Sequence, residues 1–206
     1  LKLGSSGQVP NLTFEVVAAG AIVGPWADAW VAHTASSTDS WWAVAYGTTN
    51  GNPRFVAIVG SKNNKTMYST DYGATWTAGG NTPATVPPNS GAWTGAVYGA
   101  GGFGAGGFNS STGAGIIAYS SDGGVNRSAA VGSEFPSKEL GCVCFGNGLF
   151  VTVTTSGWGG TNQVLTSNDG INWVVRATGT NSPYQSIAYG AGVYVVVGAQ
   201  SGGNRI

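Results

Sequence analysis

An eight-residue motif, Ser69-Thr-Asp-Tyr-Gly-Ala-Thr-Trp76, recurs along the chain and constrains its fold more than any other feature. Its opening returns in Ser120-Ser-Asp-Gly-Gly-Val-Asn126, which lacks the Trp, and in Ser167-Asn-Asp-Gly-Ile-Asn-Trp173, where the Trp lies one residue closer to the Asp. Successive motif aspartates are 51 (122 − 71) and 47 (169 − 122) residues apart. Repeats of about 40 to 50 residues are typical of propellers and solenoids.

A second pattern, an aromatic residue followed by glycine, keeps a similar period. It occurs at Tyr46-Gly47, Tyr98-Gly99, Phe145-Gly146 and Tyr189-Gly190, with steps of 52, 47 and 44 residues (98 − 46, 145 − 98 and 189 − 145). The apolar runs around these pairs are short and show no helical periodicity, so they indicate strands. The second run of each repeat is apolar on both faces, which is typical of a sheet that is covered on both sides.

Each complete repeat is therefore predicted to form four short antiparallel strands, and the whole chain is predicted to have an all-β fold. The predicted inner strands are 41–46, 92–98, 141–145 and 185–189, the second strands 54–59, 102–108, 149–154 and 193–197, the third strands 66–69, 115–119 and 163–166, and the outer strands start at 76, 125 and 173. Four strands per repeat leave no room for helices.

The three motifs resemble the Asp-box, or bacterial neuraminidase repeat, whose pattern is Ser-x-Asp-x-Gly-x-Thr-Trp. The resemblance implies a β-propeller of four-stranded antiparallel blades, in which each box is the turn between the third and the outer strand. In such a turn Ser and Asp bond to the backbone, Gly supplies a positive φ, and Trp packs between blades. We therefore interpret these box residues as structural rather than catalytic: Ser69, Asp71, Gly73, Trp76, Ser120, Asp122, Gly124, Ser167, Asp169 and Trp173.

The number of repeats leaves two interpretations of the ring. Residues 41–206 hold about three and a half blades, whereas propellers have about four to eight. Residues 1–40 do not share the repeat; we interpret them as a lead-in segment that could supply a ring-closing strand. Either that strand completes a four-bladed ring, or the chain is part of a longer protein with further blades, and we favour the second interpretation.

Charged residues are scarce, which argues against several kinds of partner. The chain has 8 Lys and Arg and 8 Asp and Glu, so its formal net charge is zero. We predict neither nucleic-acid binding nor membrane insertion, because no basic footprint and no long apolar run is present. Cys142 and Cys144, the two cysteines, are interpreted as small buried residues. We predict no metal and no cofactor.

In propellers of the resembled kind, ligands bind at the face opposite the Asp boxes. Here that face would consist of the loops between second and third strands and the links between blades, which are rich in Asn, Ser and Thr. Neutral amides and hydroxyls beside an aromatic ring suit sugar hydroxyls. The predicted ligand-binding residues are Trp158, Tyr184, Asn63, Asn64, Asn109 and Asn162. The alternative is that these are ordinary polar loops.

Catalysis is a weaker interpretation. Sialidases of the resembled fold clamp a carboxylate with three convergent arginines and use a Tyr–Glu nucleophile pair with an Asp acid/base. The arginines of this chain are Arg54, Arg127, Arg176 and Arg205. The Phe/Tyr-Arg-Ile-Pro motif of sialidases is absent, and outside the boxes only Glu134 and Glu139 are expected near the binding face. We therefore predict no catalytic residue.

Two short segments resemble bacteriophage tail proteins. Gly7-Gln-Val-Pro-Asn-Leu-Thr-Phe-Glu-Val16 is similar to part of tail-tip proteins, and Tyr189-Gly-Ala-Gly-Val-Tyr-Val-Val-Val197 resembles a repeat of phage tail proteins. The resemblance implies a virion or extracellular protein, a non-catalytic recognition or structural module that binds host-surface glycan or other virion proteins and could form an oligomer. The alternative is a fragment of a secreted, glycosidase-like carbohydrate-active enzyme whose catalytic residues lie outside this chain.

Overall fold

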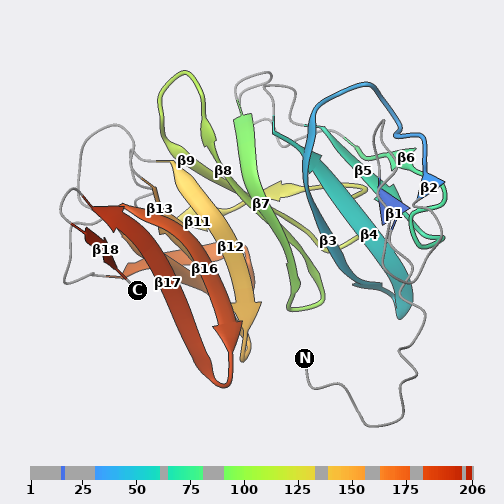
Figure 1. The fold of residues 1–206 in the computed structure, drawn as a ribbon. Coiled ribbons are helices and arrows are strands. Elements are labelled where there is room, and N and C mark those ends of the chain that lie inside the picture. Colours follow the sequence, from blue (N-terminus) through green and yellow to red (C-terminus); the bar gives the residue numbers. More distant parts are fainter. Residues whose placement is uncertain are drawn as a thin grey trace, which may run out of the picture.

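The computed structural model describes residues 15–16, 31–60, 65–80, 91–132, 139–155, 163–176, 183–200 and 203–205. These residues form a two-stranded parallel sheet followed by four mainly antiparallel sheets in order along the chain, and no helix occurs among them (Figure 1). The predicted all-β propeller architecture, with about three and a half blades, is confirmed.

The strands of each blade pair in the order in which they occur along the chain. Blade 1 contains β3 (Trp41–Thr49), β4 (Asn52–Val59), β5 (Thr66–Ser69) and β6 (Thr77–Ala78). Blade 2 contains β7 (Gly91–Gly99), β8 (Gly102–Asn109), β9 (Gly115–Ser120) and β10 (Ser128–Ala129). Blade 3 contains β12 (Leu140–Gly146), β13 (Leu149–Thr154), β14 (Val164–Ser167) and β15 (Asn172–Arg176). Blade 4 contains β16 (Tyr184–Gly190), β17 (Val193–Gln200) and β18 (Gly203–Arg205).

Three strands differ from the prediction. β10 starts at Ser128 rather than at residue 125, because Asp122 still holds Asn126 in the turn through two 2.8 Å hydrogen bonds. β11 (Val131–Gly132), in a segment expected to be only a link, pairs in parallel with β15 as a fifth strand of blade 3. β18 pairs with β17, so blade 4 has the third strand that the sequence was expected to lack.

The segment before blade 1 is described only in part. β1 (Glu15–Val16) and β2 (Val31–Ala32) pair in parallel with each other, and the following residues lead into β3. Among the described strands, none from this segment belongs to the sheet of blade 4. The ring-closing role of residues 1–40 stays a prediction.

Tight turns join the inner and second strands of all four blades. The turn residues are Asn50-Gly51, Ala100-Gly101, Asn147-Gly148 and Ala191-Gly192, and both residues of each turn have a positive φ. This is type I′ geometry, whose twist matches that of the strands it joins. Glycine at the second position adopts this conformation without steric cost.

An aromatic pair on each blade links the inner strand to the second strand. The ring centroids lie 4.6–5.0 Å apart in Tyr46–Phe55, Tyr98–Phe103, Phe145–Phe150 and Tyr189–Tyr194. Three of these pairs also cover a glycine of the preceding blade. A Cβ atom would lie only 2.1 or 2.2 Å from the covering ring at Gly47 under Tyr98, Gly99 under Phe145 and Gly146 under Tyr189. The aromatic-glycine repeat is therefore an inter-blade contact that requires glycine.

Apolar clusters fill the spaces between neighbouring blades. Trp93, which is 2% exposed, packs between blades 1 and 2 with Ile58. Phe150 and Leu140 are fully buried in the cluster between blades 2 and 3. Val153 packs with residues of blade 4. Apolar packing against the neighbouring blades therefore stabilises each blade.

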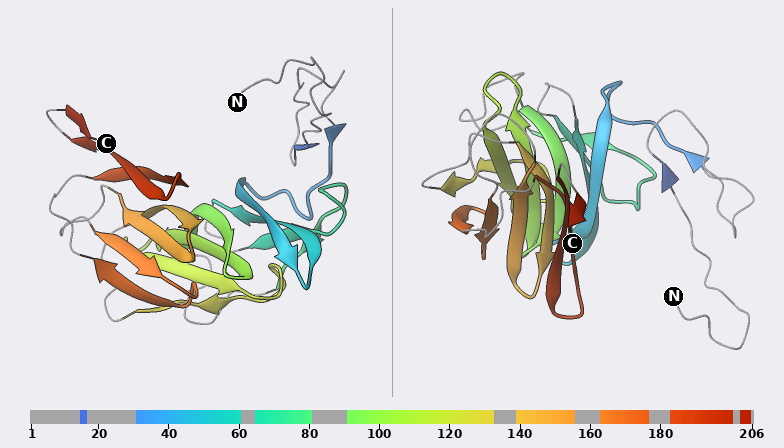
Figure 2. Two further views of the ribbon diagram at one scale, coloured as in Figure 1. Left: turned by 90° about the horizontal axis from the view of Figure 1, so that it is seen from below. Right: turned by 60° about the vertical axis from the view of Figure 1, so that its left-hand side comes forward.

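The outer faces of blades 1 and 4 carry exposed apolar residues. Figure 2 shows the four sheets side by side along an open arc, with blade 1 at one end and blade 4 at the other. The position of a Cβ atom on Gly190 has no atom within 4 Å, and Tyr46 is 52% exposed. Among the described residues, the glycine of blade 4 and the aromatic residue of blade 1 thus do not make the inter-blade contact that the other members of the repeat make.

Candidate functional site

The strand directions place the Asp boxes on one rim of the blades. β5, β9 and β14 end at Ser69, Ser120 and Ser167, the first residues of the three boxes. The loops that enter these strands therefore lie at the opposite rim, which we call the loop face. Inner strands run parallel to the third strands, since both are antiparallel to the second strand, so the inner strands also begin at the loop face.

The first box is a turn held by its own Ser and Asp side chains. Ser69 Oγ donates to Asp71 Oδ1 over 2.7 Å and accepts from the backbone amide of Gly73 over 2.8 Å. Asp71 accepts from the backbone amide and the hydroxyl of Thr75 over 2.9 and 2.6 Å. Gly73 has a φ of 93°, and its carbonyl accepts from Trp76 Nε1 over 2.8 Å. Every defined position of the motif takes part in the turn.

The second box has the same network with Asn in the place of Thr. Ser120 Oγ donates to Asp122 Oδ1 and accepts from the amide of Gly124, both over 2.8 Å. Asn126 donates its backbone and side-chain amides to the two oxygens of Asp122. The network thus does not depend on the missing Trp.

The third box closes one residue earlier. Ser167 Oγ donates to Asp169 Oδ1 over 3.0 Å and accepts from the amide of Gly170 over 2.8 Å. Asn172 donates its backbone and side-chain amides to Asp169, both over 2.7 Å. Sequence reasoning did not include Gly170, Thr75, Asn126 or Asn172 among the box residues. The last three occupy the Thr position of the motif pattern and donate to the box Asp, so that position was the available signal.

These hydrogen bonds stabilise the ionised form of the box carboxylates. Bonds from Thr75, above all from its hydroxyl, hold the pKa of Asp71 at about 2. Burial raises the pKa of Asp169, but bonds from Asn172 and the turn backbone outweigh this effect and hold it at about 2. The same balance lowers the pKa of Asp122. Carboxylates that stay ionised and accept bonds from their own turn are poorly suited to donate protons near neutral pH.

The residue at the Trp position of the second and third boxes packs between blades. Trp173 is 5% exposed, in a cluster that includes Tyr119 of blade 2. Arg127 takes this position in the second box, where its Nη2 donates to the carbonyl of Gly80 over 2.8 Å and burial lowers its pKa to about 10. Arg127 also lines a small cavity with Val56 of blade 1. This arginine therefore belongs to the inter-blade packing.

The other described arginine side chains lie on different blades. The Arg54 guanidinium lies 4.4 Å from the ring centroid of Tyr68 on blade 1. Arg176 Nε donates to Thr166 Oγ1 over 3.0 Å on blade 3. Arg54 and Arg176 are thus engaged with neighbouring strands of their own blades, whereas Arg127 lies between blades 1 and 2.

Asn109, a predicted ligand residue, opens a loop of the loop face. Its Oδ1 accepts from the backbone amides of Ser111 and Thr112 over 2.9 and 3.3 Å. Its own backbone amide donates to the carbonyl of Ala114 over 2.7 Å, and Thr112 Oγ1 accepts from the amide of Ala114 over 3.3 Å. Asn109 therefore orders the loop, and Ser111 and Thr112 are exposed at its tip.

Tyr184, a second predicted ligand residue, begins β16 at the same face. It is half-buried and packs against the cluster that contains Val153 and Ile187. Tyr184 and Asn109 belong to blades 4 and 2, with blade 3 between them, so the structure does not bring them together. The remaining predicted ligand residues lie outside the described residues and stay predictions: Trp158, Asn63, Asn64 and Asn162.

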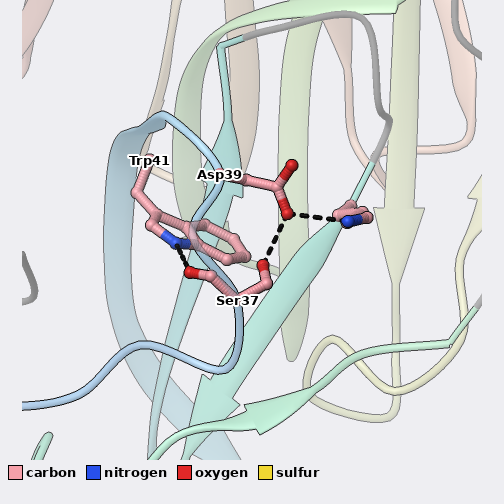
Figure 3. A network of polar contacts seen from close by, with 4 residues as sticks. Ser37, Asp39 and Trp41 are labelled. Atoms are coloured by element: carbon pink, nitrogen blue, oxygen red, sulfur yellow. Dashed lines mark hydrogen bonds and ion pairs between the residues drawn. The ribbon is translucent and has the colours of Figure 1, made fainter.

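A polar network at the loop face of blade 1 was missed by sequence reasoning (Figure 3). Ser37 Oγ donates to Asp39 Oδ2 over 2.5 Å, and Lys65 Nζ forms an ion pair with the same oxygen over 2.7 Å. Trp41 Nε1 donates to the carbonyl of Ser37 over 3.2 Å. The network fixes the segment before β3 against the start of β5. Its Ser-x-Asp spacing, which the boxes share, was the available signal.

Among the described residues, no group of three or more His, Cys, Asp and Glu side chains could hold a metal ion. In the same part of the chain, no helix has the length and apolarity needed to cross a bilayer. Cys142 and Cys144 are free thiols beside the cluster between blades 3 and 4, and burial raises the pKa of Cys144.

The four-stranded sheets and their Asp-box turns define the class of the protein, a β-propeller. No protein-family model matches the sequence, and no curated protein matches it. Among solved structures, YCF48 bound to a D1 peptide is 14% identical, with a TM-score of 0.56 over 80% of this chain and 48% of that one.

Two further structures are similar at lower TM-scores. YCF48 from Cyanidioschyzon merolae is 15% identical, with a TM-score of 0.43 over 75% of this chain and 61% of that one. The GH32 β-fructofuranosidase BmSUC1 of Bombyx mori is 13% identical, with a TM-score of 0.43 over 78% of this chain and 40% of that one. The alignment with the peptide-bound YCF48 shows a shared fold, and the chain spans about half of that protein's length.

Proposed function

We propose that this chain is a non-catalytic recognition module of a bacteriophage tail or fibre, which binds host-surface glycan through its loop face. The observation that carries the proposal is the loop opened by Asn109. Its backbone is held by side-chain hydrogen bonds, and its exposed tip consists of the neutral Ser111 and Thr112. A loop that is ordered before binding loses less entropy when it takes a ligand.

The chemistry of this loop suits sugars better than charged ligands. Ser and Thr hydroxyls both donate and accept, as sugar hydroxyls do. The chain as a whole has zero formal net charge, so no long-range field would select a charged partner. The ionised box carboxylates support a structural role for the opposite rim.

Binding and cleavage can be separated in one experiment. The purified chain is exposed to immobilised bacterial surface polysaccharides, and the supernatant is analysed by mass spectrometry for released oligosaccharide. We expect saturable binding without product, and weaker binding for the double variant Ser111→Ala, Thr112→Ala and for Trp158→Ala and Tyr184→Ala. The control is Tyr72→Asn at the box rim, where Tyr72 is 63% exposed and has a φ of 60°, a conformation that Asn tolerates.

Each other outcome contradicts a defined part of the proposal. Released oligosaccharide would support the carbohydrate-active enzyme instead. Full binding by all loop-face variants would overturn the site. No glycan binding, together with capture of the chain by purified tail proteins, would assign the loop face to contacts within a virion.

A further inference from the structure

The tight turns between inner and second strands form a series in which two members differ from the others. Asn-Gly occurs twice in the sequence, at Asn50-Gly51 and Asn147-Gly148, and both pairs are turns of this series. The turns of blades 2 and 4 have Ala100 and Ala191 in the place of the Asn. The fold therefore holds Asn in two of its four equivalent turns, with Ala as the natural comparison in the other two.

Both Asn-Gly turns are exposed and leave their glycine open. Asn50 and Asn147 are exposed residues. Apart from the adjacent residues, no described atom lies within 4 Å of the position that a Cβ would take at Gly51 or Gly148, and the same is true of Gly101 in blade 2. Blades 2 and 3 have a neighbouring blade on each side, so this openness belongs to the turn itself.

An exposed Asn-Gly pair places a nucleophile next to an electrophile. The backbone nitrogen of the glycine attacks Cγ of the Asn side chain, and glycine has no Cβ that obstructs the approach. A bond forms between this nitrogen and Cγ, the Cγ–Nδ2 bond breaks, the N–H proton passes to solvent, and Nδ2 leaves as ammonia. Water then opens the cyclic imide at either carbonyl carbon and gives aspartate or isoaspartate.

The backbone of these turns already has one of the two angles that the attack needs. The first residue has φ and ψ of about 60° and 30° in a type I′ turn, and of about 60° and −120° in a type II′ turn. The second ψ is the one at which the glycine nitrogen eclipses Cβ of the Asn, as closure of the imide requires. Asn50 and Asn147 have φ values of 51° and 44°. A flip of the following peptide plane, which changes ψ alone, therefore brings the reacting atoms together.

A side-chain hydrogen bond opposes this flip in blade 1. Asn52 Nδ2 donates to the backbone carbonyl oxygen of Asn50 over 3.3 Å. This oxygen belongs to the peptide plane that has to turn, so the flip breaks the bond. Asn52 therefore holds the turn in the unreactive geometry.

The turn of blade 3 is held differently. Leu149, which has no side-chain donor, takes the place of Asn52. Tyr194 Oη lies within hydrogen-bond distance of the backbone carbonyl oxygens of Gly146 and Leu149, the two residues that flank the turn. Among the described residues no side chain donates to the carbonyl of Asn147. The flanking strand ends are thus fixed while the peptide between residues 147 and 148 can flip.

We propose that Asn147 is a site of spontaneous deamidation in the folded chain, and that Asn52 protects the equivalent Asn50. The reaction adds a negative charge to a chain whose formal net charge is zero. Its isoaspartate product also adds a backbone carbon to a two-residue turn, which disturbs the pairing of Gly146 with Leu149. The proposal is independent of glycan recognition, because these turns lie at the box rim, opposite the loop face.

The test follows both sites in the folded chain at mildly alkaline pH, in water enriched in heavy oxygen so that only new products are labelled. Peptides from a digest are separated and identified by mass spectrometry. We expect Asn147 to convert about two- to tenfold faster than Asn50, the factor that corresponds to one hydrogen bond. Asn52→Leu, which copies the turn of blade 3, should raise the rate at Asn50 by the same factor and leave the rate at Asn147 unchanged.

Two controls separate the effect of the fold from that of the sequence. In urea the chain is unfolded, so Asn50 and Asn147 should convert at similar rates, and Asn52→Leu should have no effect. Asn147→Ala, which copies the turns of blades 2 and 4, should remove the labelled product of blade 3 and leave the circular dichroism spectrum unchanged.

Three results would overturn the proposal. Conversion of Asn147 in urea but not in the folded chain would mean that the fold protects both turns. Similar rates at the two sites in the folded chain would contradict the protection by Asn52. The same holds for a folded Asn52→Leu variant, with an unchanged circular dichroism spectrum, in which Asn50 converts no faster.

Discussion

Replacing Gly99 with Ala tests whether the aromatic-glycine contact holds neighbouring blades together. The added Cβ would lie 2.2 Å from Cγ of Phe145. Carbon atoms in contact prefer about 3.5–4.0 Å, so the ring or the strand must move by about 1.3–1.8 Å. Phe145 is itself packed against Phe150 at 4.6 Å between centroids, which leaves little room for this movement.

The expected loss of stability is near the upper end of the range for overpacked cores, about 3 kcal/mol. For a chain of this size each kcal/mol lowers Tm by about 2–4 °C, so Tm should fall by about 6–12 °C. Gly190→Ala is the matched control, because the same position in blade 4 has no atom within 4 Å of the Cβ. A Gly to Ala change at an unstrained position stabilises by about 0.4–1 kcal/mol.

Both variants are compared with the unsubstituted chain. Thermal and urea unfolding are followed by circular dichroism and tryptophan fluorescence. Equal losses for Gly99→Ala and Gly190→Ala would refute the reasoning, because only the first position has a ring above it. An unchanged stability of the Gly99→Ala variant would show that the inner strands of blades 2 and 3 can move apart without a loss of free energy.

Three further predictions concern the boxes and the arginines. Ser120→Ala leaves a buried backbone amide without its acceptor and should cost about 1–3 kcal/mol in urea unfolding. The pKa values of Asp71 and Asp169 are held at about 2 in the folded chain, below the ordinary value of 3.8. The stability that the two ionised carboxylates contribute to the folded state is therefore present above pH 3.8 and is lost as the pH falls to 2. The double variant Asp71→Asn, Asp169→Asn should show a flatter dependence of Tm on pH in this window. Arg127→Ala should destabilise by about 1–3 kcal/mol, whereas the exposed Arg176→Ala should change stability by less than about 0.5 kcal/mol, and similar losses for both would contradict the inter-blade role of Arg127.

The blades were predictable because their pattern is local. Short apolar runs between turn residues indicate strands, and the box motif marks where the third strand ends. β11 was not predictable, because a two-residue strand that pairs in parallel with β15 depends on how blade 3 is placed. β10 starts three residues after the predicted position because Asn126, which takes the place of the Thr of the motif, donates two hydrogen bonds to Asp122 and stays in the turn.

The candidate site was less predictable, since loop function depends on side-chain direction. Asn109 was selected as a sugar ligand, but its side-chain oxygen Oδ1 accepts hydrogen bonds from backbone amides of its own loop. An Asn that opens a turn has this option wherever it occurs, and the sequence does not distinguish the two uses. Arg127 directly follows the second box in the sequence, but its insertion between blades depends on packing around Val56 and Gly80.

The four glycines of the aromatic-glycine repeat differ in what covers them. Glycine in a strand costs about 0.5–1 kcal/mol relative to Ala. At Gly47, Gly99 and Gly146 an aromatic ring occupies the space that a Cβ would need, and burial of that ring offsets the cost. At Gly190 no atom of the described residues lies within 4 Å of the Cβ position, although β17 next to it is apolar on both faces.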